Sequence, residues 1–579
     1  MLSCFPLSFA LKLEERTMKQ KTILTLLVLS LLLALPLLVF AEPAAPVFSV
    51  PGGFYDAGFE LEMTSPDGYE IRYTTDANDP AKITDPYIYK IPVRVENTDA
   101  QPNTISAIRE ITLEWYMPPQ EPVPKCTVVR AVCVAPDGTV SPETMETYFI
   151  GRTEAYYDTI DTISLVTEGS NLFGSADGIF AIGYRIEDWM KSDDYEEYEH
   201  LSDPRYPTNY NQRGREWERP ATIQVFADGK NVFSQDIGIR VKGNFTRSNA
   251  QKSLTFYARK EYGKGKMKYD FFGGKCLDAN GEPITEFDRV CIRSGGNDYA
   301  GVRFRDDLNQ ELMGQTNLGV QTKRPYLLYI NGEFWGLYSM QEKEDKHYVA
   351  AHYGVDKDNV TVIKCGKLED GSEEILEEYR DLYEWAAEAD FSDPEEYARL
   401  DAAMDLDGLI DLFVGESYVC NYDFAILINN WTIWRVNEPD GSPYGDGKWR
   451  FLVYDTEYSL GLYDQIPTQY DYDYLNQMDI DSTNLALPVV LFDLVMDNED
   501  FRARFYDRYI ELADTVYSAE NVLPIIERMM DEQEDACLDT MKRFGITWND
   551  YRGEAGKISH FFKNRREYAL ESLEAFCAE

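Results

Sequence analysis

Two short stretches place acidic and amide side chains beside apolar, strand-like runs. The first, NYDFAILINNWTIWR, carries Asp423 and, six and seven residues later, Asn429 and Asn430. The second, KWRFLVYDTEYSLG, carries Asp455 at the end of its apolar run and Glu457 two residues further on. Carboxylate and amide oxygens are the ligands that Mg²⁺ prefers, together with oxygens of a bound phosphate. The two stretches therefore predict a site for a divalent metal and a phosphorylated substrate, with the acids held rigidly by apolar strands.

Phosphoryl transfer also needs cations that hold the triphosphate. Lys252 follows the turn GNFTRSN on a predicted strand, and its ammonium suits the α- and β-phosphates as a point charge. Arg240 precedes the turn, and Gly243 and Asn244 open it, where backbone N–H groups could approach phosphate. No G-x-G-x-x-G motif occurs here, so the turn would be a substitute phosphate cradle. An exposed strand lysine without a ligand is the alternative for Lys252.

Two further acids stand at the ends of predicted elements. Asp306 lies in FRDDLNQELMG, a run with helical spacing inside an otherwise strand-rich part. It is a candidate to orient Lys252, as are Asp307 and Glu311 of the same run, and capping its own helix is the alternative. Glu342 ends the strand run EFWGLYSMQE, where the chain leaves the strand-rich part. Adenine would meet backbone groups at such a crossing, so Glu342 is a candidate ATP-binding hinge residue; a solvated charge is the alternative.

Composition narrows the partners. The net charge of −45 over 579 residues argues against nucleic acid or an anionic membrane, because both would repel the chain. A chain of this length exceeds one hydrophobic core, so we expect two or three domains. Eight cysteines beyond Cys4 are scattered without a C-x-x-C, and Cys276 with Cys291 is a local candidate for a disulfide. His347 and His352 are five apart, a poor spacing for zinc, so the sequence indicates no metal–imidazole site.

The N-terminal region predicts export. Residues 18–41, MKQKTILTLLVLSLLLALPLLVFA, combine a positive start, a long apolar run and a small-residue exit, as in a signal peptide that ends at Ala41. An uncleaved membrane anchor is the alternative, because the apolar run is about as long as a short membrane span. Met18 is a better start than Met1, since residues 1–17 carry no targeting pattern and suit an untranslated segment. We therefore expect a secreted or cell-surface protein.

The order of predicted elements divides the rest of the chain into three parts. Residues 42–150 show short, β-branched or aromatic runs between turns, which predicts a β-sandwich accessory domain. Residues 151–365 alternate strands with one helix, and residues 366–579 are mainly helical around the two acid-bearing strands. This order predicts the α+β class: a bilobal, protein-kinase-like fold, with a sheet-rich nucleotide lobe and a helical second lobe, preceded by a small all-β sandwich.

Six blocks of the sequence carry a resemblance to a known family. In order they are IGIRVKGNFTRSNAQKSLTFYARKEYG, CIRSGGND, FRDDLNQELMG, YLLYINGEFWGLYSMQEKEDKHYV and the two acid-bearing stretches. Together they resemble the CotH-type kinase family, named for a spore-coat protein, over about residues 160–575. The resemblance implies an atypical protein kinase that transfers the γ-phosphate of ATP to Ser or Thr of protein substrates, with Mg²⁺, or alternatively Mn²⁺, as the metal.

The same resemblance implies roles for the acids. Asp423 corresponds to the family's catalytic aspartate, which accepts the hydroxyl proton or orients the hydroxyl. Asp455 corresponds to the second metal aspartate, the counterpart of the Asp in a kinase D-F-G, although no Phe-Gly follows it here. Ordinary kinases place the metal asparagine five residues after the catalytic aspartate. Because the gap here is six or seven residues, Asn429 and Asn430 both remain candidates, with Glu457 as a candidate extra ligand.

A second resemblance covers residues 42–150. PDGYEIRYTTDANDP and VVRAVCVAPDGTVSPETMETYFI are similar to the small β-sandwich module at the C-terminal end of chitobiases and hexosaminidases. Exported bacterial enzymes carry this module as an accessory domain, and it holds no catalytic residues. The resemblance implies a role in spacing or surface presentation, with cell wall or polysaccharide as a partner.

Two other functions stay open at the level of the sequence. A catalytically inactive, kinase-shaped protein could bind at a cell surface or to polysaccharide, and the scarcity of ATP outside cells favours this reading. A glycoside hydrolase would place two carboxylates across a cleft. Abundant aromatic side chains suit sugar binding, but no acid pair stands out. Nucleotide binding is the property that separates a kinase from the inactive alternative.

Overall fold

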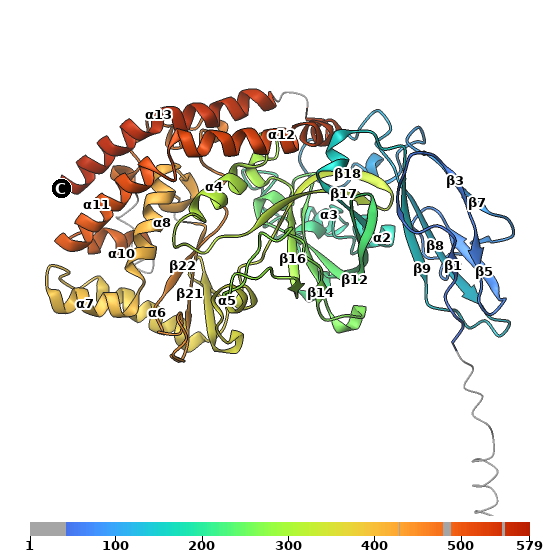
Figure 1. Ribbon diagram of the computed structural model, residues 1–579, viewed down its shortest axis with the longest axis horizontal. Coiled ribbons are helices and arrows are strands. Elements are labelled where there is room, and N and C mark those ends of the chain that lie inside the picture. The colour runs from blue at the N-terminus through green and yellow to red at the C-terminus, as the bar shows by residue number, and fades with distance from the viewer. Residues whose placement is uncertain (1–41, 428, 479–487, 547–549, 579) are drawn as a thin grey trace, which may run out of the picture.

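The protein is a mixed α and β structure in which strand-rich parts come first along the chain and helices last (Figure 1). The computed structural model describes residues 42–427, 429–478, 488–546 and 550–578. The α+β class and the order of a sheet-rich part before a helical part are confirmed. The predicted signal peptide lies outside the described residues. Among those residues, no helix is both long enough and apolar enough to cross a bilayer.

The first part consists of short strands around a small core of its own (Figure 1). Its strands are β1 (Val47–Phe48), β2 (Gly53–Tyr55), β3 (Phe59–Leu61), β4 (Met63–Thr64), β5 (Glu70–Thr74), β6 (Tyr87–Ile88), β7 (Val93–Val95), β8 (Thr127–Val134) and β9 (Thr144–Ile150). β2, β9, β8, β5 and β6 are hydrogen-bonded in that order, while β1 pairs with β4 and β3 with β7. The expected strands are present, and the resemblance to the chitobiase module stays a prediction.

Seven strands of the next part close into a ring. They are β10 (Asp161–Val166), β11 (Arg219–Ala227), β12 (Lys230–Lys242), β13 (Ser253–Tyr257), β16 (Arg289–Arg293), β17 (Lys323–Ile330) and β18 (Glu333–Gln341). Their order is β11-β10-β17-β18-β16-β13-β12, and the ring closes because β11 also pairs with β12. Ile223, Phe256 and Leu328 belong to the buried apolar cluster of these strands. A closed, packed ring holds the side chains at its ends with little freedom, which suits a binding site.

The N-terminal strands β1–β9 are joined to the ring by strand pairing and by side-chain hydrogen bonds. β2 pairs with β12, Gly53 opposite Lys230, so the two parts share one twelve-stranded sheet. The buried carboxylate of Glu333 accepts hydrogen bonds from the backbone N–H groups of Thr104, at 2.6 Å, and of Ser106, at 2.8 Å. A charged acceptor with backbone donors is among the stronger hydrogen bonds in proteins. This geometry holds the N-terminal strands against the ring.

Beyond β18 the chain passes through α5 (Lys346–Tyr353) into a second sheet. That sheet has the order β20 (Lys367–Asp370), β19 (Val360–Lys364), β21 (Trp431–Val436) and β22 (Arg450–Val453). Asp423 was expected at the edge of a strand, but it lies in the short helix α9 (Tyr422–Ala425). The side chain of Asn421 accepts a hydrogen bond from the backbone N–H of Asp423, and this cap starts a helical turn before the strand.

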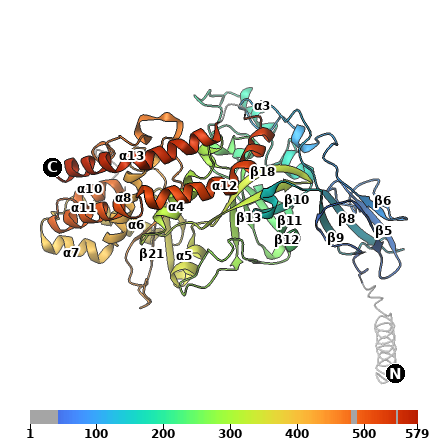
Figure 2. The same ribbon diagram turned by 45° about the horizontal axis from the view of Figure 1, so that its top comes forward.

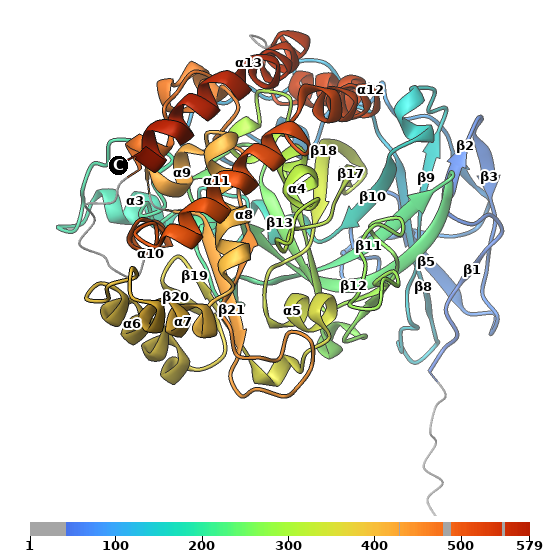
Figure 3. The ribbon, with the colours of Figure 1, turned by 60° about the vertical axis from the view of Figure 1, so that its left-hand side comes forward.

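Helices form the C-terminal half (Figure 1). The longer ones are α6 (Glu373–Ala386), α7 (Pro394–Ala403), α8 (Leu406–Tyr418), α10 (Pro488–Val495), α11 (Glu499–Asp514), α12 (Ala519–Arg543) and α13 (Tyr551–Ala578). Short elements of the sheet-rich part are α2 (Gly169–Phe173), α3 (Arg185–Met190), α4 (Arg305–Met313), β14 (Met267–Lys268) and β15 (Glu286–Phe287). Helix α8 packs on β22, and Figure 3 shows α8 above β21, the neighbour of β22 in the sheet. Ser372 caps α6, because its side chain accepts a hydrogen bond from the backbone N–H of Glu374.

The C-terminal helices also brace the ring. α12 and α13 lie side by side, and α12 packs on β18 (Figure 2). The backbone N–H of Leu337 donates to Thr540 Oγ1 at 2.7 Å. Gly336 has φ +113°, and a Cβ there would lie 2.6 Å from Thr540 Cγ2, so only glycine permits this close approach. The last helices of the chain therefore help to fix the strands that carry the candidate site.

Candidate active site

Arg293 joins three carboxylates at one end of the ring. It is the last residue of β16, and the strand register places it opposite Ser339 of β18. Its guanidinium bonds to the carboxylates of Asp455 and Glu457. Its Nη1 also lies 3.4 Å from Asp306 Oδ2. One cation of the sheet-rich part therefore holds an acid of helix α4 and two acids that follow β22.

Lys323 is a second cation on the same helix acid. Its Nζ bonds to Asp306 and lies 3.1 Å from Gln341 Oε1, and its side chain is only 5% exposed. The other oxygen of Asp306 accepts hydrogen bonds from the backbone N–H and the hydroxyl of Thr456, both at 3.0 Å. Burial opposes ionisation of Asp306, but Lys323 and Arg293 outweigh it and lower its pKa to about 2. Asp306 thus orients a lysine, as predicted, but the lysine is Lys323.

Asn430 links the two candidate aspartates. Its Nδ2 donates to Asp423 Oδ2 and to the backbone carbonyl of Asp455, each at 3.1 Å. Asn430 and Asp455 have φ values of +55° and +59°, a left-handed conformation that Asn and Asp tolerate better than most residues. Asn429 is exposed, with its Oδ1 3.5 Å from Cys365 Sγ. Of the two amides that the sequence left open, the structure brings Asn430 to the acids.

The acids of this cluster have widely separated pKa values. Burial, together with the neighbouring charge of Asp455, raises the pKa of Asp423 to about 7. Burial also opposes ionisation of Asp455, but Arg293 outweighs it and holds the pKa of Asp455 well below its usual range. Burial raises the pKa of Glu457 well above its usual range. Asp423 is therefore the carboxyl group of the cluster whose pKa suits proton transfer near neutral pH.

Lys242 brings a third cation to the cluster. It ends β12, and the register places it opposite Ser253 at the end of the ring where Arg293 lies. Burial lowers the pKa of Lys242 to about 8, and the charges of Arg293 and Lys323 act in the same direction. Positively charged side chains that lie close together repel one another unless anions lie between them. The lysine therefore adds to a positive group that suits a polyanionic ligand.

Lys364 and Glu344 complete the polar lining. Lys364 ends β19, with its Nζ 3.6 Å from Glu344 Oε2 and 3.0 Å from the centre of the Tyr454 ring. Glu344 is buried, and neither carboxylate oxygen has a hydrogen-bond partner among the described residues. Burial raises the pKa of Glu344 to about 7, against the charges of Lys364 and Lys242. Glu344 is therefore an acceptor available to a ligand donor beside the cations.

The structure contradicts the predicted phosphate-binding role of Lys252. Its side chain is buried, and its ammonium donates to the backbone carbonyls of Arg247, at 2.7 Å, and Asn249, at 3.1 Å. The same ammonium lies 3.9 Å from the centre of the Tyr210 ring. Burial, with the charge of Arg247, lowers the pKa of Lys252 well below its usual range. This lysine holds the turn in shape instead of facing a triphosphate.

The predicted phosphate cradle is only partly beside the cations. Arg240 and Gly243 line one hollow with Lys242, which keeps them next to the cation group. The guanidinium of Arg240 lies 4.1 Å from the Tyr257 ring centre. Asn244 is exposed, and its side-chain oxygen accepts a hydrogen bond from Arg213 at 2.9 Å. Asn244 therefore has a protein partner and is not among the residues that line the hollow.

Glu342 is a buried, paired residue and not an open hinge contact. Its Oε1 lies 2.7 Å from His352 Nε2, and its Oε2 accepts from the backbone N–H of Thr322 at 3.0 Å. Its backbone carbonyl accepts from Gln321 Nε2 at 2.9 Å. Burial opposes ionisation, but His352 outweighs it and lowers the pKa of Glu342. Because its side chain and carbonyl are occupied, the predicted contact with adenine is not supported.

The predicted disulfide is also wrong. The eight cysteines among the described residues are all free, including Cys276 and Cys291. Cys291 lies on β16 with its sulfur 3.4 Å from Thr255 Oγ1. Cys276 lies between β14 and β15 and faces His352. Cys276 and Cys291 are close along the chain, which suggested a disulfide. In the structure the two thiols instead lie beside different partners, His352 and Thr255.

Sequence reasoning missed the cations that the structure brings to the acids. Arg293 stands in the quoted block CIRSGGND, at the end of an apolar strand and before two glycines. Lys242 and Lys323 likewise stand at strand ends, in IRVKG and KRPYLLYI. A charged residue at the end of an apolar strand was a usable signal. It did not rank these three above Lys252, because only strand register decides which ends meet.

A strand ring and a helical part that contribute cations and acids to one site define a kinase-like protein. The sequence model described as CotH kinase protein matches residues 239–569, from within β12 into α13. This is more than half of the chain, so the protein belongs to the CotH kinase protein family. The matched range includes Arg293, Asp306, Asp423 and Asp455. No curated protein matches the chain.

Proposed function

We propose that this protein is an exported kinase that transfers the γ-phosphate of ATP to Ser or Thr hydroxyls of surface, coat or secreted proteins. One observation supports it most: Asn430 bonds to both Asp423 and Asp455, and Arg293 of the ring bonds to Asp455. Acids of the helical part and cations of the sheet-rich part therefore meet at one place. Positioned cations, a carboxylate for the acceptor hydroxyl and oxygen ligands for a metal are what phosphoryl transfer requires.

Asp423 is the group proposed to act on the acceptor hydroxyl. Its pKa of about 7 means that a substantial fraction is ionised near neutral pH and that its carboxylate is a better proton acceptor than an ordinary one. The hydrogen bond from Asn430 fixes one of its oxygens and leaves the other for the hydroxyl. In this proposal Asp423 orients the hydroxyl and receives its proton as the hydroxyl oxygen forms a bond to the γ-phosphorus. The bond from that phosphorus to the bridging oxygen breaks at the same time, and ADP leaves.

The cations are proposed to hold the phosphates. Arg293 offers planar donors that suit two phosphate oxygens, and Lys242, Lys323 and Lys364 act as point charges around it. Arg240 and Gly243 line the adjoining hollow. Several positive groups held in a buried place stabilise transferring phosphoryl oxygens more than exposed charges would. Because burial and like charge already lower the pKa of Lys242, an anion between these cations would relieve their repulsion.

The donor set fits Mg²⁺, or Mn²⁺ as the alternative. Asp455, Asn430 and Glu457 offer carboxylate and amide oxygens, and Glu457 Oε2 is buried without a hydrogen-bond partner among the described residues. A metal bound there would supply charge for the phosphate oxygens. Arg293 bonds to the same two carboxylates, so it is proposed to share them with the metal or turn toward phosphate.

The contact between Arg293 and these acids also favours a second candidate. A guanidinium that neutralises Asp455 and Glu457 without a metal would suit a kinase-shaped binding protein at a cell surface or on polysaccharide. Such a protein would keep the fold while losing phosphoryl transfer. Export through the segment at residues 18–41, and contact of the N-terminal strands with cell wall or polysaccharide, belong to both candidates as proposals.

The test uses the chain from Glu42 onward with γ-labelled ATP and Mg²⁺, followed by mass spectrometry of the protein and of added acceptor proteins. The kinase proposal expects label on Ser or Thr, an Asp455→Asn variant without label, and a melting temperature that rises with millimolar Mg-ATP. A melting temperature that Mg-ATP leaves unchanged, with no label in any acceptor, would overturn the kinase proposal and favour the binding protein.

A further inference from the structure

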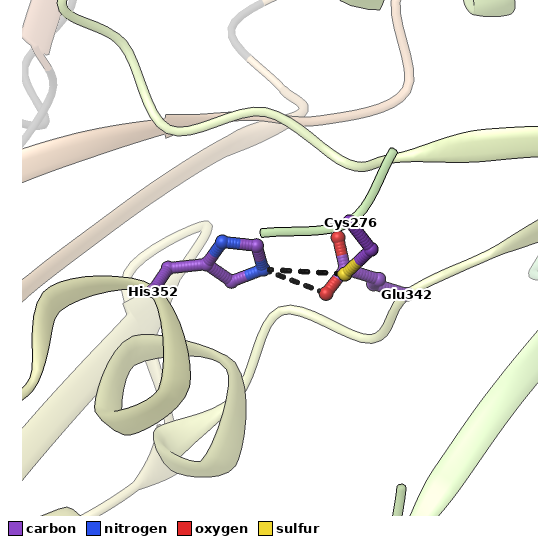
Figure 4. Close-up of side chains that lie close together, drawn as sticks. All are labelled: Cys276, Glu342 and His352. Carbon is purple, nitrogen blue, oxygen red and sulfur yellow. Dashed lines mark hydrogen bonds and ion pairs between the residues drawn. The ribbon is translucent and has the colours of Figure 1, made fainter. Parts of the chain in front are cut away.

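A thiol, an imidazole and a carboxylate from three separate segments meet outside the candidate active site (Figure 4). Cys276 comes from the segment between β14 and β15, Glu342 directly follows β18, and His352 lies on α5. His352 Nε2 lies 2.7 Å from Glu342 Oε1 and 4.0 Å from Cys276 Sγ. One ligand atom of each residue lies within 4.8 Å of the others. Cys276 and Glu342 are buried, so this is an interior cluster and not a chance group of surface acids.

Surrounding contacts orient two of the three side chains, those of His352 and Glu342. The centre of the His352 ring lies 4.2 Å from the centre of the Tyr348 ring. The backbone N–H of Thr322 donates to Glu342 Oε2, which leaves Oε1 facing the cluster. Protein ligands of metal ions are typically oriented by such second hydrogen bonds to backbone or side chains.

The donor atoms are those that zinc takes in proteins. Zinc binds thiolate at ~2.3 Å and imidazole at ~2.0 Å, so ligand atoms of a tetrahedral site lie roughly 3.3–3.6 Å apart. The distances of 2.7 Å and 4.0 Å lie on either side of that spacing. Opening the first and closing the second, each by about half an ångström, would need only small side-chain rotations. Three protein ligands leave a fourth position for water.

An entry path lies beside the cluster. His352 lines a surface hollow together with Leu277, Thr322 and Tyr348. The carboxylates of Asp405, Asp407 and Asp446 from the second lobe line the same hollow. Lys275, Lys448 and Arg450 also line it, so the hollow carries three cations beside the three acids. An ion from solvent could therefore reach His352 Nε2 without unfolding the protein.

We propose that Cys276, Glu342 and His352 bind one zinc ion at the connection between the two lobes. The ion would join the segment before β15 and helix α5 to the end of β18. Glu344, which faces the cations of the candidate active site, lies two residues beyond Glu342. The ion would fix the segment that crosses between the lobes, and its fourth position would stay open to water. This proposal stands apart from phosphoryl transfer, because none of its three ligands contacts Asp423 or Asp455 among the contacts of the described residues.

The test begins with the purified chain from Glu42 onward, stripped with a chelator and then dialysed against Zn²⁺. We expect one zinc per chain by mass spectrometry and a melting temperature that rises with free Zn²⁺. Replacing zinc by Co²⁺ should give a thiolate-to-cobalt charge-transfer band in the near ultraviolet. This spectrum reports sulfur ligation in the unaltered protein and does not depend on whether a variant folds.

Variants then assign the ligands. Cys276→Ser should remove the charge-transfer band, and Cys276→Ser and His352→Gln should each weaken zinc binding by at least about tenfold. Cys291→Ser, which alters another buried thiol, and His347→Gln, which alters the other histidine of α5, are matched controls expected to bind like the unaltered chain. Less than about a tenth of an equivalent of zinc, or a cobalt band that survives in Cys276→Ser, would overturn the proposal.

Discussion

Lys252 directly precedes β13 and Lys323 begins β17 of the same ring, and both side chains are buried, yet they have different partners. The Lys252 ammonium is held by two backbone carbonyls and the Tyr210 ring. The Lys323 ammonium is held by Asp306, which in turn bonds to the segment that carries Asp455. Carbonyl dipoles stabilise a cation without linking it to other charges, whereas a carboxylate adds it to a network. The partner, and not burial or strand position, decides which lysine belongs to the fold and which to the site.

The same contrast separates the two regions around these lysines. Around Lys252, the buried guanidinium of Arg247 donates to four backbone carbonyls, those of Tyr210, Gln212, Val241 and Gly243. Around Lys323, Arg293 and Lys323 meet acids from α4 and from beyond β22. The first region is closed by its own backbone. The second is held by side chains from distant segments and presents charge that a ligand can use.

The largest expected effect tests the second region directly. Asp455→Asn replaces the carboxylate that is proposed to bind the metal and that bonds to Arg293, and we expect phosphoryl transfer to fall by at least about 100-fold. Labelling from γ-labelled ATP measures it, with circular dichroism as the check on folding. Asp464→Asn is the matched control, because Asp464 also has a positive φ, at +54°, but pairs with Lys557. If Asp455→Asn kept the full rate, the assignment of Asp455 would have to be withdrawn.

A second experiment replaces Lys323 and Lys252 in turn and compares the two variants. Lys323→Met should lower phosphoryl transfer by at least about 100-fold, because Asp306 loses the cation that it orients. Lys252→Met should leave the rate within about twofold and lower the free energy of unfolding by about 1–3 kcal/mol, since two buried carbonyls lose their donor. Initial rates and urea unfolding of both variants measure this. The reverse outcome, with Lys252→Met inactive and Lys323→Met active, would restore the expectation from the sequence.

A smaller effect separates the two neighbouring asparagines. Asn430→Gly keeps the backbone free to adopt a positive φ but removes the amide between Asp423 and Asp455, and we expect the rate to fall by about 10- to 100-fold. Asn429→Gly should change the rate by less than about twofold, because Asn429 points to Cys365. Rates of both variants at saturating ATP and Mg²⁺ measure the difference. Equal losses would mean that the segment, and not one amide, supports the site.

The smallest expected effect is on the pH dependence of the stability of the protein, through Glu416. Glu416 on α8 accepts a hydrogen bond from Asn421 at 2.7 Å, and burial raises its pKa from 4.5 to about 8. The folded state therefore keeps a proton that the unfolded chain releases. This contribution to stability is complete below about pH 4 and is lost as the pH rises through about 8.

Glu416→Gln carries no such proton, so its melting temperature should fall less than that of the unaltered chain between pH 5 and about 8. Thermal unfolding across this pH range measures the difference in slope. Glu374→Gln, at an exposed position of α6, should retain the slope of the unaltered chain. If Glu416→Gln also retained it, the buried carboxyl would not be the source of the pH dependence.

The sequence alone determined the family, the α+β class and the two acid-bearing segments. Local pattern suffices for these because helix starts, such as Ser372, and apolar strand runs are set by neighbours along the chain. Asp423 and Asp455 became candidates for the same reason: each stands in a short motif with its own spacing. The prediction that Asp423 lies at the edge of a strand was wrong, because the side-chain cap of Asn421 favours a helical turn there.

The tertiary structure decided which residues meet. Strand register and the closure of the ring bring three cations to the acids, namely Arg293, Lys242 and Lys323. The sequence of a single segment specifies neither the register nor the closure. The choice of Asn430 over Asn429 depends on a left-handed backbone position, and the meeting of Cys276, Glu342 and His352 depends on three segments packing together. Spacing along the chain fixes only neighbours, whereas contacts between distant segments follow from how strands pair and helices pack.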